Sequence, residues 1–360
     1  MGTGRDLRYE HILAEVLGTP WAITPPYLAI ISEIVARRAA GTALTEEELE
    51  ARLAAAQERP ATRPSGVQIG TVAVMPLVGA LLPRGEAMKQ MSGATSVQHL
   101  TKMFDRLVAD ESISAIVLDF DSPGGSVGGI AEFADRVFAS RAVKPVVAIA
   151  NPVMASAAYW IGAAATELLV TPTAQTGSIG VFTAHADVSK ALEQEGVTIT
   201  LVSAGAKKTL GNPFEPLSED ARAELQKHVD AFYGMFVKGV ARGRGQPASK
   251  VRGGFGQGGV VGAAEAVELG MADAVGTIDD AIGRAAARAQ QRAVGGAAGA
   301  RALAPTRAEQ RDPNDDGTCP EGYHKTDDGM CEPDAQADIQ PAAYAAEAKA
   351  LRELLAARGA

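Results

Sequence analysis

Apolar positions in the middle of the chain form two kinds of pattern. Short apolar runs bounded by turn residues predict buried strands, whereas stretches with apolar residues three and four positions apart predict helices. The predicted strands are residues 67–77, 113–120, 146–150 and 197–202. The predicted helices are residues 96–108, 127–138 and 218–242. Because strands and helices alternate along the chain, the pattern predicts an α/β fold.

The two ends of the chain follow other patterns. Helical spacing at residues 9–17 and 26–38, and an acidic helix start at residues 45–50, precede a proline-containing linker. From about residue 285 onward alanine, arginine, glutamine and glycine dominate, and such low complexity is typical of flexible chain. We therefore divide the chain into a helical segment with its linker (1–66), an α/β domain (67–285) and a flexible, partly helical, scaffold-like tail (286–360).

Overall composition and charge narrow the class of protein. Apolar residues make up 46% and charged residues 21% of the 360, as in globular proteins. The net charge of −9 argues against nucleic acid as the main partner. No apolar run is long enough to cross a bilayer, and the N-terminus lacks the apolar core of a signal peptide. We therefore expect a soluble cytoplasmic protein with no membrane or nucleic-acid partner.

One serine stands at a place that suits a nucleophile. Ser156 follows the predicted strand 146–150 within Asn-Pro-Val-Met-Ala-Ser-Ala-Ala-Tyr and opens an alanine-rich helical stretch. Small neighbours let a substrate backbone approach the hydroxyl, and the start of a helix offers unpaired N–H groups to an oxyanion. The alternative interpretation is a helix cap, which is the commoner role of such a serine. Two further segments favour the nucleophile.

Both of these segments follow predicted strands. Ser-Pro-Gly-Gly places Gly124 and Gly125 where the backbone can approach a developing negative charge, although an ordinary strand-to-helix turn has the same composition. Lys207 and Lys208 follow the last predicted strand. A lysine in such a place is usually a solvated charge, and it acts as a general base only where burial keeps it neutral.

The order of these motifs resembles one protein family. Along the chain come Ser-Pro-Gly-Gly, then Met-Ala-Ser-Ala-Ala-Tyr, then Thr-Gly-Ser-Ile-Gly-Val at residues 176–181, and then Gly-Ala-Lys-Lys with a proline five residues on. Together with residues 258–273, this order over about residues 67–285 is similar to the signal peptide peptidase A family of serine proteases. The resemblance implies a ClpP/crotonase-like fold with repeated β-β-α units, and a serine endopeptidase with a Ser–Lys dyad and neither cofactor nor metal.

The resemblance also assigns roles to single residues. Ser156 matches the nucleophile, and Lys208 matches the general base in a Ser-Gly-x-x-Lys pattern whose first residue is here Ala204. Supporting positions are matched by Gly124, Gly125 and Ala157 for the oxyanion hole, and by Ser178 and Thr176 around the lysine. Lys207 is the neighbouring alternative for the base. His185 lies nearest among the histidines, and a Ser–His–Asp arrangement is the poorer interpretation.

The tail contains two cysteines, Cys319 and Cys331, with His324 between them. This knuckle can bind zinc if a nearby aspartate supplies the fourth ligand, form a disulfide, or stay reduced in a cytoplasm; of these alternatives we do not favour metal. Just upstream, residues 312–317 imitate the start of a calcium loop, but no glutamate occupies its twelfth position.

The three-part layout resembles the head maturation proteases of tailed phages. This implies a homo-oligomer in the host cytoplasm, inside the procapsid, that cleaves scaffold and major capsid proteins and itself, after alanine, serine or glycine. Three alternatives stay open: a host-type cytoplasmic peptidase of the same family, a crotonase-type acyl-CoA enzyme on the same fold, and a non-catalytic assembly protein. The intact motifs argue against the last, and acyl-CoA chemistry would not need Ser156 with Lys208.

Overall fold

The computed structural model describes residues 20–39, 67–69, 71–83, 94–298, 323–325 and 331–333. The α/β fold predicted from the alternation of strands and helices is confirmed. The helix expected at residues 26–38 is α2 (Pro25–Ala39), whereas those expected at residues 9–17 and 45–50 lie outside the described residues. None of the described helices is both long and apolar enough to cross a membrane.

A mixed sheet forms the centre of the domain. Its strand order is β11-β10-β8-β6-β3-β2, and β9 pairs with β8 on one side and with β12 on the other. The pairs β3–β6, β6–β8 and β8–β10 are parallel, and the edge strands β2 and β11 run antiparallel to their neighbours. The bounds are β2 (Val67–Ile69), β3 (Val72–Val78), β6 (Ala115–Ser122), β8 (Val146–Ala155), β9 (Glu167–Val170), β10 (Gln175–Gly177), β11 (Val260–Gly262) and β12 (Ala274–Val275).

A second, smaller sheet produces the repeated β-β-α units. Its order is β1-β7-β4-β5, with bounds β1 (Trp21–Ile23), β4 (Leu81–Leu82), β5 (Thr95–Ser96) and β7 (Gly124–Ser126). Twice, a central strand is followed by the small sheet and then by a helix: first β3, the short strands β4 and β5, and α5 (Val97–Ala109), then β6, β7 and α6 (Ile130–Ser140). The glycine strand β7 therefore leaves the central sheet where β6 ends, beside the end of β8.

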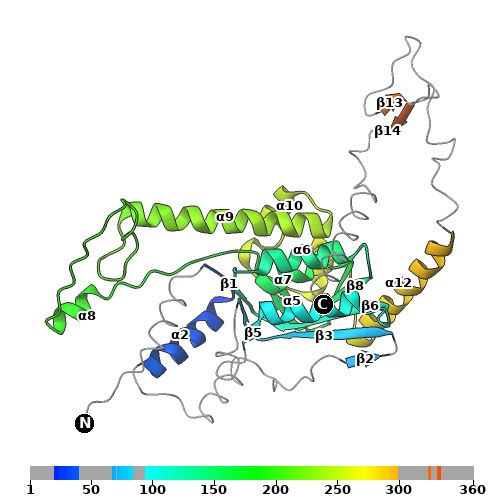
Figure 1. The fold of residues 1–360 in the computed structure, drawn as a ribbon, viewed down its shortest axis with the longest axis horizontal. Helices are drawn as coiled ribbons and strands as arrows, with labels where there is room; N and C mark the ends of the chain where they lie inside the picture. The colour runs from blue at the N-terminus through cyan, green and yellow to red at the C-terminus, as the bar shows by residue number, and fades with distance from the viewer. Residues whose placement is uncertain are drawn as a thin grey trace, which may run out of the picture.

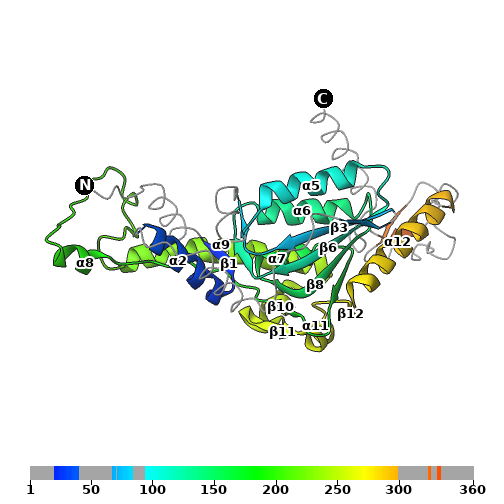
Figure 2. The ribbon, with the colours of Figure 1, turned by 90° about the horizontal axis from the view of Figure 1, so that it is seen from below.

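The two faces of the central sheet pack against different helices (Figure 2). Along β8, Val146, Ala148 and Ala150 belong to a core shared with α5, α6, α7 (Ala157–Gly162) and α9 (Glu219–Arg244). Val147 and Ile149 alternate with them and pack with α12 (Ile278–Ala298). Side chains alternate in this way because successive residues of a strand point to opposite faces, and here both faces are buried.

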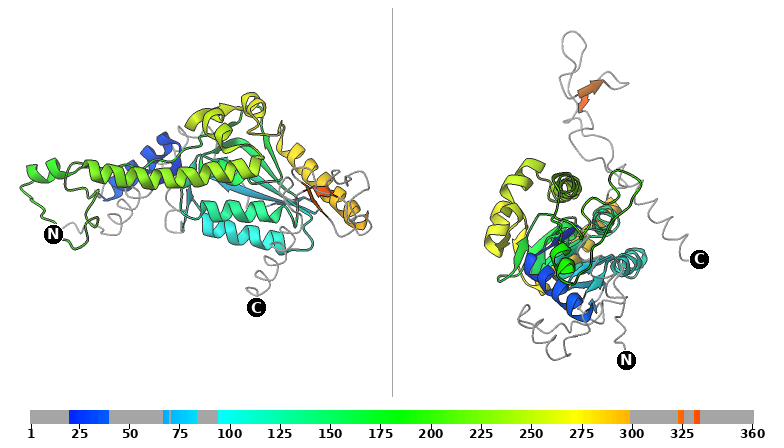
Figure 3. Two further views of the ribbon diagram at one scale, coloured as in Figure 1. Left: turned by 90° about the horizontal axis from the view of Figure 1, so that it is seen from above. Right: turned by 90° about the vertical axis from the view of Figure 1, so that its left-hand side faces the viewer.

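Helix α9 enters the core through its C-terminal part. Its buried apolar residues there are Phe236, Val237 and Val240. The Phe236 ring stacks on Trp160 with centroids 4.7 Å apart, and a β-carbon at Gly239 would lie 2.3 Å from the indole nitrogen, so this close approach requires glycine. The N-terminal part of α9 projects beyond the body of the domain (Figures 1 and 3).

An arm, defined as residues 183–218, leads to the projecting end of α9. It contains α8 (Ser189–Gln194), which lies at the end of α9 that is far from the central sheet (Figure 1). The strand predicted at residues 197–202 is wrong, since the described chain offers it no strand partner and its apolar side chains are exposed, Val202 by 94%. An apolar alternation becomes a strand only where a neighbour satisfies its backbone groups.

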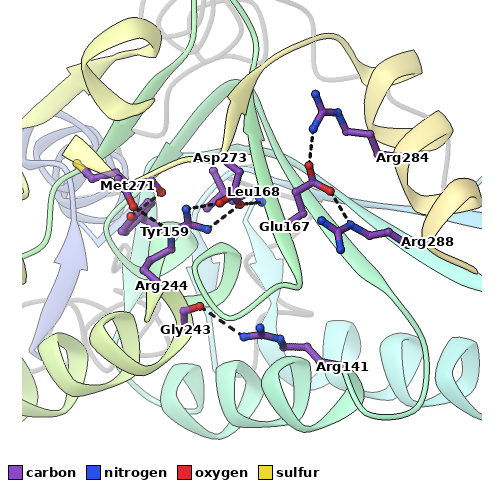
Figure 4. A network of polar contacts seen from close by, with 11 residues as sticks. Arg141, Tyr159, Glu167, Leu168, Gly243, Arg244, Met271, Asp273, Arg284 and Arg288 are labelled. Atoms are coloured by element: carbon purple, nitrogen blue, oxygen red, sulfur yellow. Dashed lines mark hydrogen bonds and ion pairs between the residues drawn. The ribbon is translucent and has the colours of Figure 1, made fainter. Parts of the chain in front are cut away.

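A buried carboxylate fastens α12 to the sheet. Glu167 of β9 accepts hydrogen bonds from Arg284 at 2.5 Å and from Arg288 at 2.6 Å (Figure 4). One turn further on, Arg292 donates to the carbonyl oxygen of Arg141 at 3.1 Å. The packed body therefore continues beyond residue 285, where composition alone placed the end of the domain.

A second network joins α9 to the segment before β12. Arg244 forms a two-pronged ion pair with Asp273, at 2.7 and 2.8 Å, and Asp273 also accepts from the Leu168 N–H (Figure 4). Burial alone raises the pKa of Asp273, but the hydrogen bonds and charge of Arg244, with the Leu168 N–H, outweigh it and lower the pKa. Burial raises the pKa of the nearby Tyr159 hydroxyl, which donates to the Met271 carbonyl.

We expect Asp273→Asn to lower the free energy of unfolding by about 1–3 kcal/mol at neutral pH, because it leaves the largely buried Arg244 guanidinium without its carboxylate. The carboxylate's contribution is present above the ordinary aspartate pKa of 3.8 and is lost as the pH falls through the lower pKa of the folded state. Denaturant titrations at neutral pH and well below pH 3.8 measure both effects.

Asp135→Asn is the matched control, because Asp135 pairs with Arg242 at the surface, where its side chain is 63% exposed. We expect this change to cost at most about 1 kcal/mol. Equal losses for the two variants, or a loss for Asp273→Asn that persists in acid, would contradict the role given to the pair.

Candidate active site

Ser156 lies at the junction of β8 and α7, in a backbone conformation that is rare for serine. Its φ is 55° and its ψ −118°, and only 1% of the residue is exposed. Its N–H donates to the Gly177 carbonyl at 2.7 Å, which joins the end of β8 to β10. No group in the described residues hydrogen-bonds to the Ser156 hydroxyl. Strained backbone and a buried unpaired hydroxyl both destabilise the fold, so they point to a functional position.

The glycine turn after β6 lies directly against this serine. A β-carbon added at Gly124, where φ is +103°, would lie 2.9 Å from the Cβ of Ser156 and 3.0 Å from the Ala155 carbonyl oxygen. A side chain would therefore collide with the junction, and the close approach requires glycine. Because Gly125 and Ala157 adjoin these two residues, the structure brings together the segments that the sequence picked out around Ser156.

Strand β10 brings two further candidates to the same place. Thr176 and Gly177 pair with Met154 and Ala155 at the end of β8. The Thr176 hydroxyl donates to the Met154 carbonyl at 2.9 Å, so it holds the two strand ends together. Ser178 follows, nearly buried and with a φ of 53°. Among the described residues other than glycine, positive φ occurs at three positions, and two of them lie at this junction.

The candidate base, Lys208, is not brought to Ser156 within the described chain. Lys208 is exposed on the arm, and its neighbour Lys207 pairs with Glu224 of α9 at 2.5 Å. Along α9, about 18 Å of helix separates Glu224 from Phe236, where the helix enters the core. The single chain therefore holds the nucleophile and the lysine segment in different places.

The other candidates from the sequence are His185 and the cysteines of the tail. His185 is also on the arm, where its Nε2 lies 2.9 Å from the Asn212 carbonyl oxygen, and no histidine of the described chain bonds to the serine hydroxyl. Cys319 lies outside the described residues. Of Cys331 only the backbone is described, in strand β14 (Cys331–Pro333), which pairs with β13 (Tyr323–Lys325). The role of the cysteine knuckle stays a prediction.

Sequence patterns missed one component of the site, strand β1. The three residues of β1 pair antiparallel with the three residues of β7, in a region for which apolar spacing predicts only helix and linker. The carbonyl oxygen of Ala22 would lie 2.3 Å from a β-carbon at Gly124, the same point that lies 2.9 Å from the Ser156 Cβ. One signal was present: Thr-Pro-Trp-Ala-Ile-Thr-Pro-Pro carries prolines on both sides, which favour extended backbone.

The arrangement supports nucleophilic chemistry at one serine. The first N–H groups of a helix have no acceptor within it, and α7 begins directly after Ser156. Together with the glycine strand, these donors can stabilise the oxyanion that forms when a hydroxyl attacks a carbonyl. Within the described residues of the single chain, no basic group hydrogen-bonds to the Ser156 hydroxyl, so a general base is still missing from the site.

Comparison with known proteins gives a family and two related phage proteins. Residues 139–292 match Peptidase family S49, a stretch that includes Ser156, the arm and most of α12. Capsid assembly protease C of Escherichia phage lambda is 34% identical over 283 residues, covering 76% of this chain and 64% of that protein. Head-tail preconnector protein GP5 of Enterobacteria phage P21 is 32% identical over 283 residues, covering 76% and 56%. The chain thus spans less than two thirds of the length of either relative.

Solved structures with a similar chain path have low sequence identity. ClpP1 from Listeria monocytogenes is 12% identical with a TM-score of 0.36, covering 58% of this chain and 94% of that one. A member of the enoyl-CoA hydratase/isomerase family is 14% identical with a TM-score of 0.34, covering 67% and 77%. The fold assignment rests on the strand order and helix layers of this chain itself.

We expect Gly124→Ala to lower the free energy of unfolding by about 1–3 kcal/mol more than Gly245→Ala does, because its new methyl group meets Ser156 and Ala22. Gly245 is the matched control: its φ of +59° is also positive, but a β-carbon there meets no atom within 4 Å. Denaturant titration of the two variants measures the difference. Equal losses would show that Gly124 is required for its φ alone.

Proposed function

We propose that this chain, whose residues 139–292 match Peptidase family S49, is a serine endopeptidase with Ser156 as its nucleophile. The observation that carries the proposal is the Ser156 hydroxyl, which is buried, held in a strained turn and placed against the glycine strand. A serine that only caps a helix accepts a hydrogen bond from an N–H of the first turn, and Ser156 makes no such side-chain bond to α7.

In the proposed reaction, the Ser156 Oγ attacks the carbonyl carbon of the scissile peptide while its proton passes to the neutral amine of Lys208. The backbone N–H groups of Gly125 and Ala157 hold the resulting oxyanion, and the bare Cα of Gly124 leaves room for the substrate. The C–N bond then breaks and Lys208 gives its proton to the leaving amine. Water releases the acyl group from Ser156 in the same two stages.

Two residues of the β10 segment would support this chemistry. We place Ser178 beside the incoming lysine, because it directly follows Gly177, whose carbonyl binds the Ser156 N–H. Thr176 acts one step away, since its hydroxyl is bonded to the Met154 carbonyl and secures the end of β8. Removal of the Thr176 hydroxyl would therefore loosen the junction without removing a reacting group.

We infer that Lys208 reaches Ser156 from the arm of another copy of the chain. The arm presents a cluster of exposed apolar side chains, and such a cluster is typical of a surface that another protein covers. Its members are Val197, Ile199, Leu201 and Val202. Because α9 carries the arm away from its own sheet (Figure 3), a second copy would both bury this segment and complete the dyad.

The substrates that we propose are proteins of phage assembly, namely the scaffold and major capsid proteins, together with the tail of the chain itself. The similarity to Capsid assembly protease C of phage lambda supports this choice. We propose that the reaction takes place inside an assembling procapsid in the host cytoplasm. Alanines flank Ser156 on both sides, and small neighbours favour a cut after alanine, serine or glycine.

We expect Ser156→Ala to abolish peptide cleavage and leave the fold intact, because it removes one oxygen from a site of small side chains. Mass spectrometry of the chain co-expressed with capsid and scaffold proteins measures cleavage, and circular dichroism measures folding. Ser140→Ala is the matched control, since it also removes a buried hydroxyl, bonded to the Arg136 carbonyl within α6.

Comparable cleavage by Ser156→Ala and by the native chain would overturn the role of Ser156. Processing of phage proteins that is unaffected by Ser156→Ala would favour a non-catalytic assembly protein. Turnover of acyl-CoA thioesters, with no cleavage of peptides by the native chain, would favour the crotonase-type alternative.

We expect Lys208→Ala and Lys208→Arg to be inactive and Lys207→Ala to stay active, because guanidinium remains charged at working pH and Lys207 is the partner of Glu224. If Lys208 acts on another copy, a mixture of Ser156→Ala chains and Lys208→Ala chains regains part of the native rate of peptide cleavage.

The control mixes Lys208→Ala chains with chains that carry both substitutions. Because no chain in this mixture contains Lys208, we expect it to stay inactive. Activity of Lys208→Ala alone would remove Lys208 from the mechanism. A failure of the first mixture, with both variants assembled at the native size, would place the dyad within one chain.

A further inference from the structure

We propose that β1 occupies, within its own chain, the groove in which this enzyme holds a substrate strand, so that the free enzyme is autoinhibited. The proposal rests on the proposed function, because it takes Ser156 as the nucleophile and the glycine strand as the wall of the groove. Its basis is the position of Trp21–Ile23, which the reaction itself does not require.

First, β1 covers one edge of the glycine strand. Strand β7 pairs with β4 on one side and with β1 on the other. An extended peptide binds a sheet by pairing its backbone with such an edge, and side-chain pockets then select its sequence. While β1 is in place, that edge of β7 cannot pair with a substrate.

Second, the Ala22 carbonyl oxygen lies close to the serine turn, on the side of the glycine strand that faces β1. Its oxygen and the Ser156 Cβ are 2.3 and 2.9 Å from one common point, the β-carbon position of Gly124, so the two atoms are close neighbours. The Thr24 N–H donates to the Pro123 carbonyl. By the alternation of antiparallel pairing, Ala22 and Gly125, two residues along, form a hydrogen-bonded pair. The Gly125 N–H, our proposed oxyanion donor, is thus directed at β1.

Third, the chain after Ser178 closes the other side of β1. The Trp21 N–H donates to the Phe182 carbonyl at 2.8 Å, and the Phe182 N–H donates to the Trp21 carbonyl at 3.0 Å. Strand β1 is therefore held between β7 and this segment, with backbone hydrogen bonds on both edges. A short peptide clamped between two strands beside a nucleophile is in the geometry of a bound substrate, here supplied by the enzyme.

Fourth, the side chains of β1 can leave without opening the main core. Trp21 and Ile23 pack in a small separate cluster with Leu28 and Ile31 of α2 and with Ala80, Leu82 and Ala94 of the domain body. Only Ala22, with one methyl group, points into the main core. Strand β1 and helix α2 can therefore be displaced together. The main core loses only the Ala22 methyl group, and the edge of β7 becomes free together with Ala80, Leu82 and Ala94, against which side chains of a substrate can pack.

These contacts define the substrate that can displace β1. It is an extended protein segment with a small residue at the position of Ala22, since that side chain is completely buried and next to the junction. Bulky apolar residues on either side would replace Trp21 and Ile23. A short peptide that lacks them competes poorly with β1, which is present at the high effective concentration of a tethered segment.

The test locks β1 in place with a disulfide. Trp21 and Phe182 exchange two hydrogen bonds, so their Cα atoms stand at about 5.5 Å, a separation that a disulfide can span. Trp21→Cys and Phe182→Cys are combined with Cys319→Ser and Cys331→Ser, which remove the two native cysteines. We expect oxidation to lower the rate of peptide cleavage at least tenfold and reduction to restore it.

Equal rates in the oxidised and reduced forms, with the disulfide verified by mass, would overturn autoinhibition and leave the protease assignment standing. No cleavage by the reduced form, by its parent with only the two serine substitutions or by the native chain would overturn the proposed function itself. The two failures are therefore distinguishable.

A second measurement does not depend on activity. In the Ser156→Ala chain, hydrogen exchange at residues 21–24 reports whether β1 is in its groove. We expect an added peptide with the sequence Pro-Trp-Ala-Ile-Thr, the native residues 20–24, to speed exchange there at least several-fold, and a peptide with arginine in place of its alanine to have no effect. Binding of the first peptide with unchanged exchange of β1 would overturn the proposal.

Discussion

The hydrogen bond from the Ser156 N–H to the Gly177 carbonyl is the contact on which the site depends. Strand β9 pairs with the first part of one edge of β8 and β10 pairs with the last part, and this bond ends the pairing of β8 with β10. Beyond it the chain passes Ser178 and reaches Phe182, which holds Trp21. A shift of β10 by one residue would turn its side chains to the opposite face. It would also displace the turn at Ser156, the close approach of Gly124 to that turn, and the pairing of Phe182 with Trp21.

The molecule divides into a packed body and an exposed arm, and the two proposed members of the dyad lie on different sides of that division. Ser156 is held by a sheet that is buried on both faces, with α12 fastened to one face through Glu167. Lys208 belongs to a segment whose apolar side chains are exposed in the single chain. Under the proposed function, a site divided in this way would become active only on assembly.

Strand β1 would add a second restraint of a different physical kind. Assembly would bring a base to the serine, whereas displacement of β1 frees the edge of β7 and the Gly125 N–H. Both restraints act on backbone geometry around Ser156, and neither requires a change in the body of the domain. A substrate that is concentrated in the same particle would compete with a tethered strand far better than the same substrate diluted in the cytoplasm.

Local pattern in the sequence was enough to predict the α/β fold, the central strands and the segments around Ser156, because short-range chemistry decides them: apolar runs make buried strands, and glycine permits the close approach at Gly124. Local sequence pattern does not specify which distant segments pair with one another. Residues 197–202 alternate like a strand but have no neighbour in the described chain, whereas β1 is a strand of three residues whose partner lies about a hundred positions later. Tertiary structure alone decided that Ala22 lies near the serine turn and that Lys208 does not, since both outcomes depend on where long-range backbone hydrogen bonds and helix packing carry each segment.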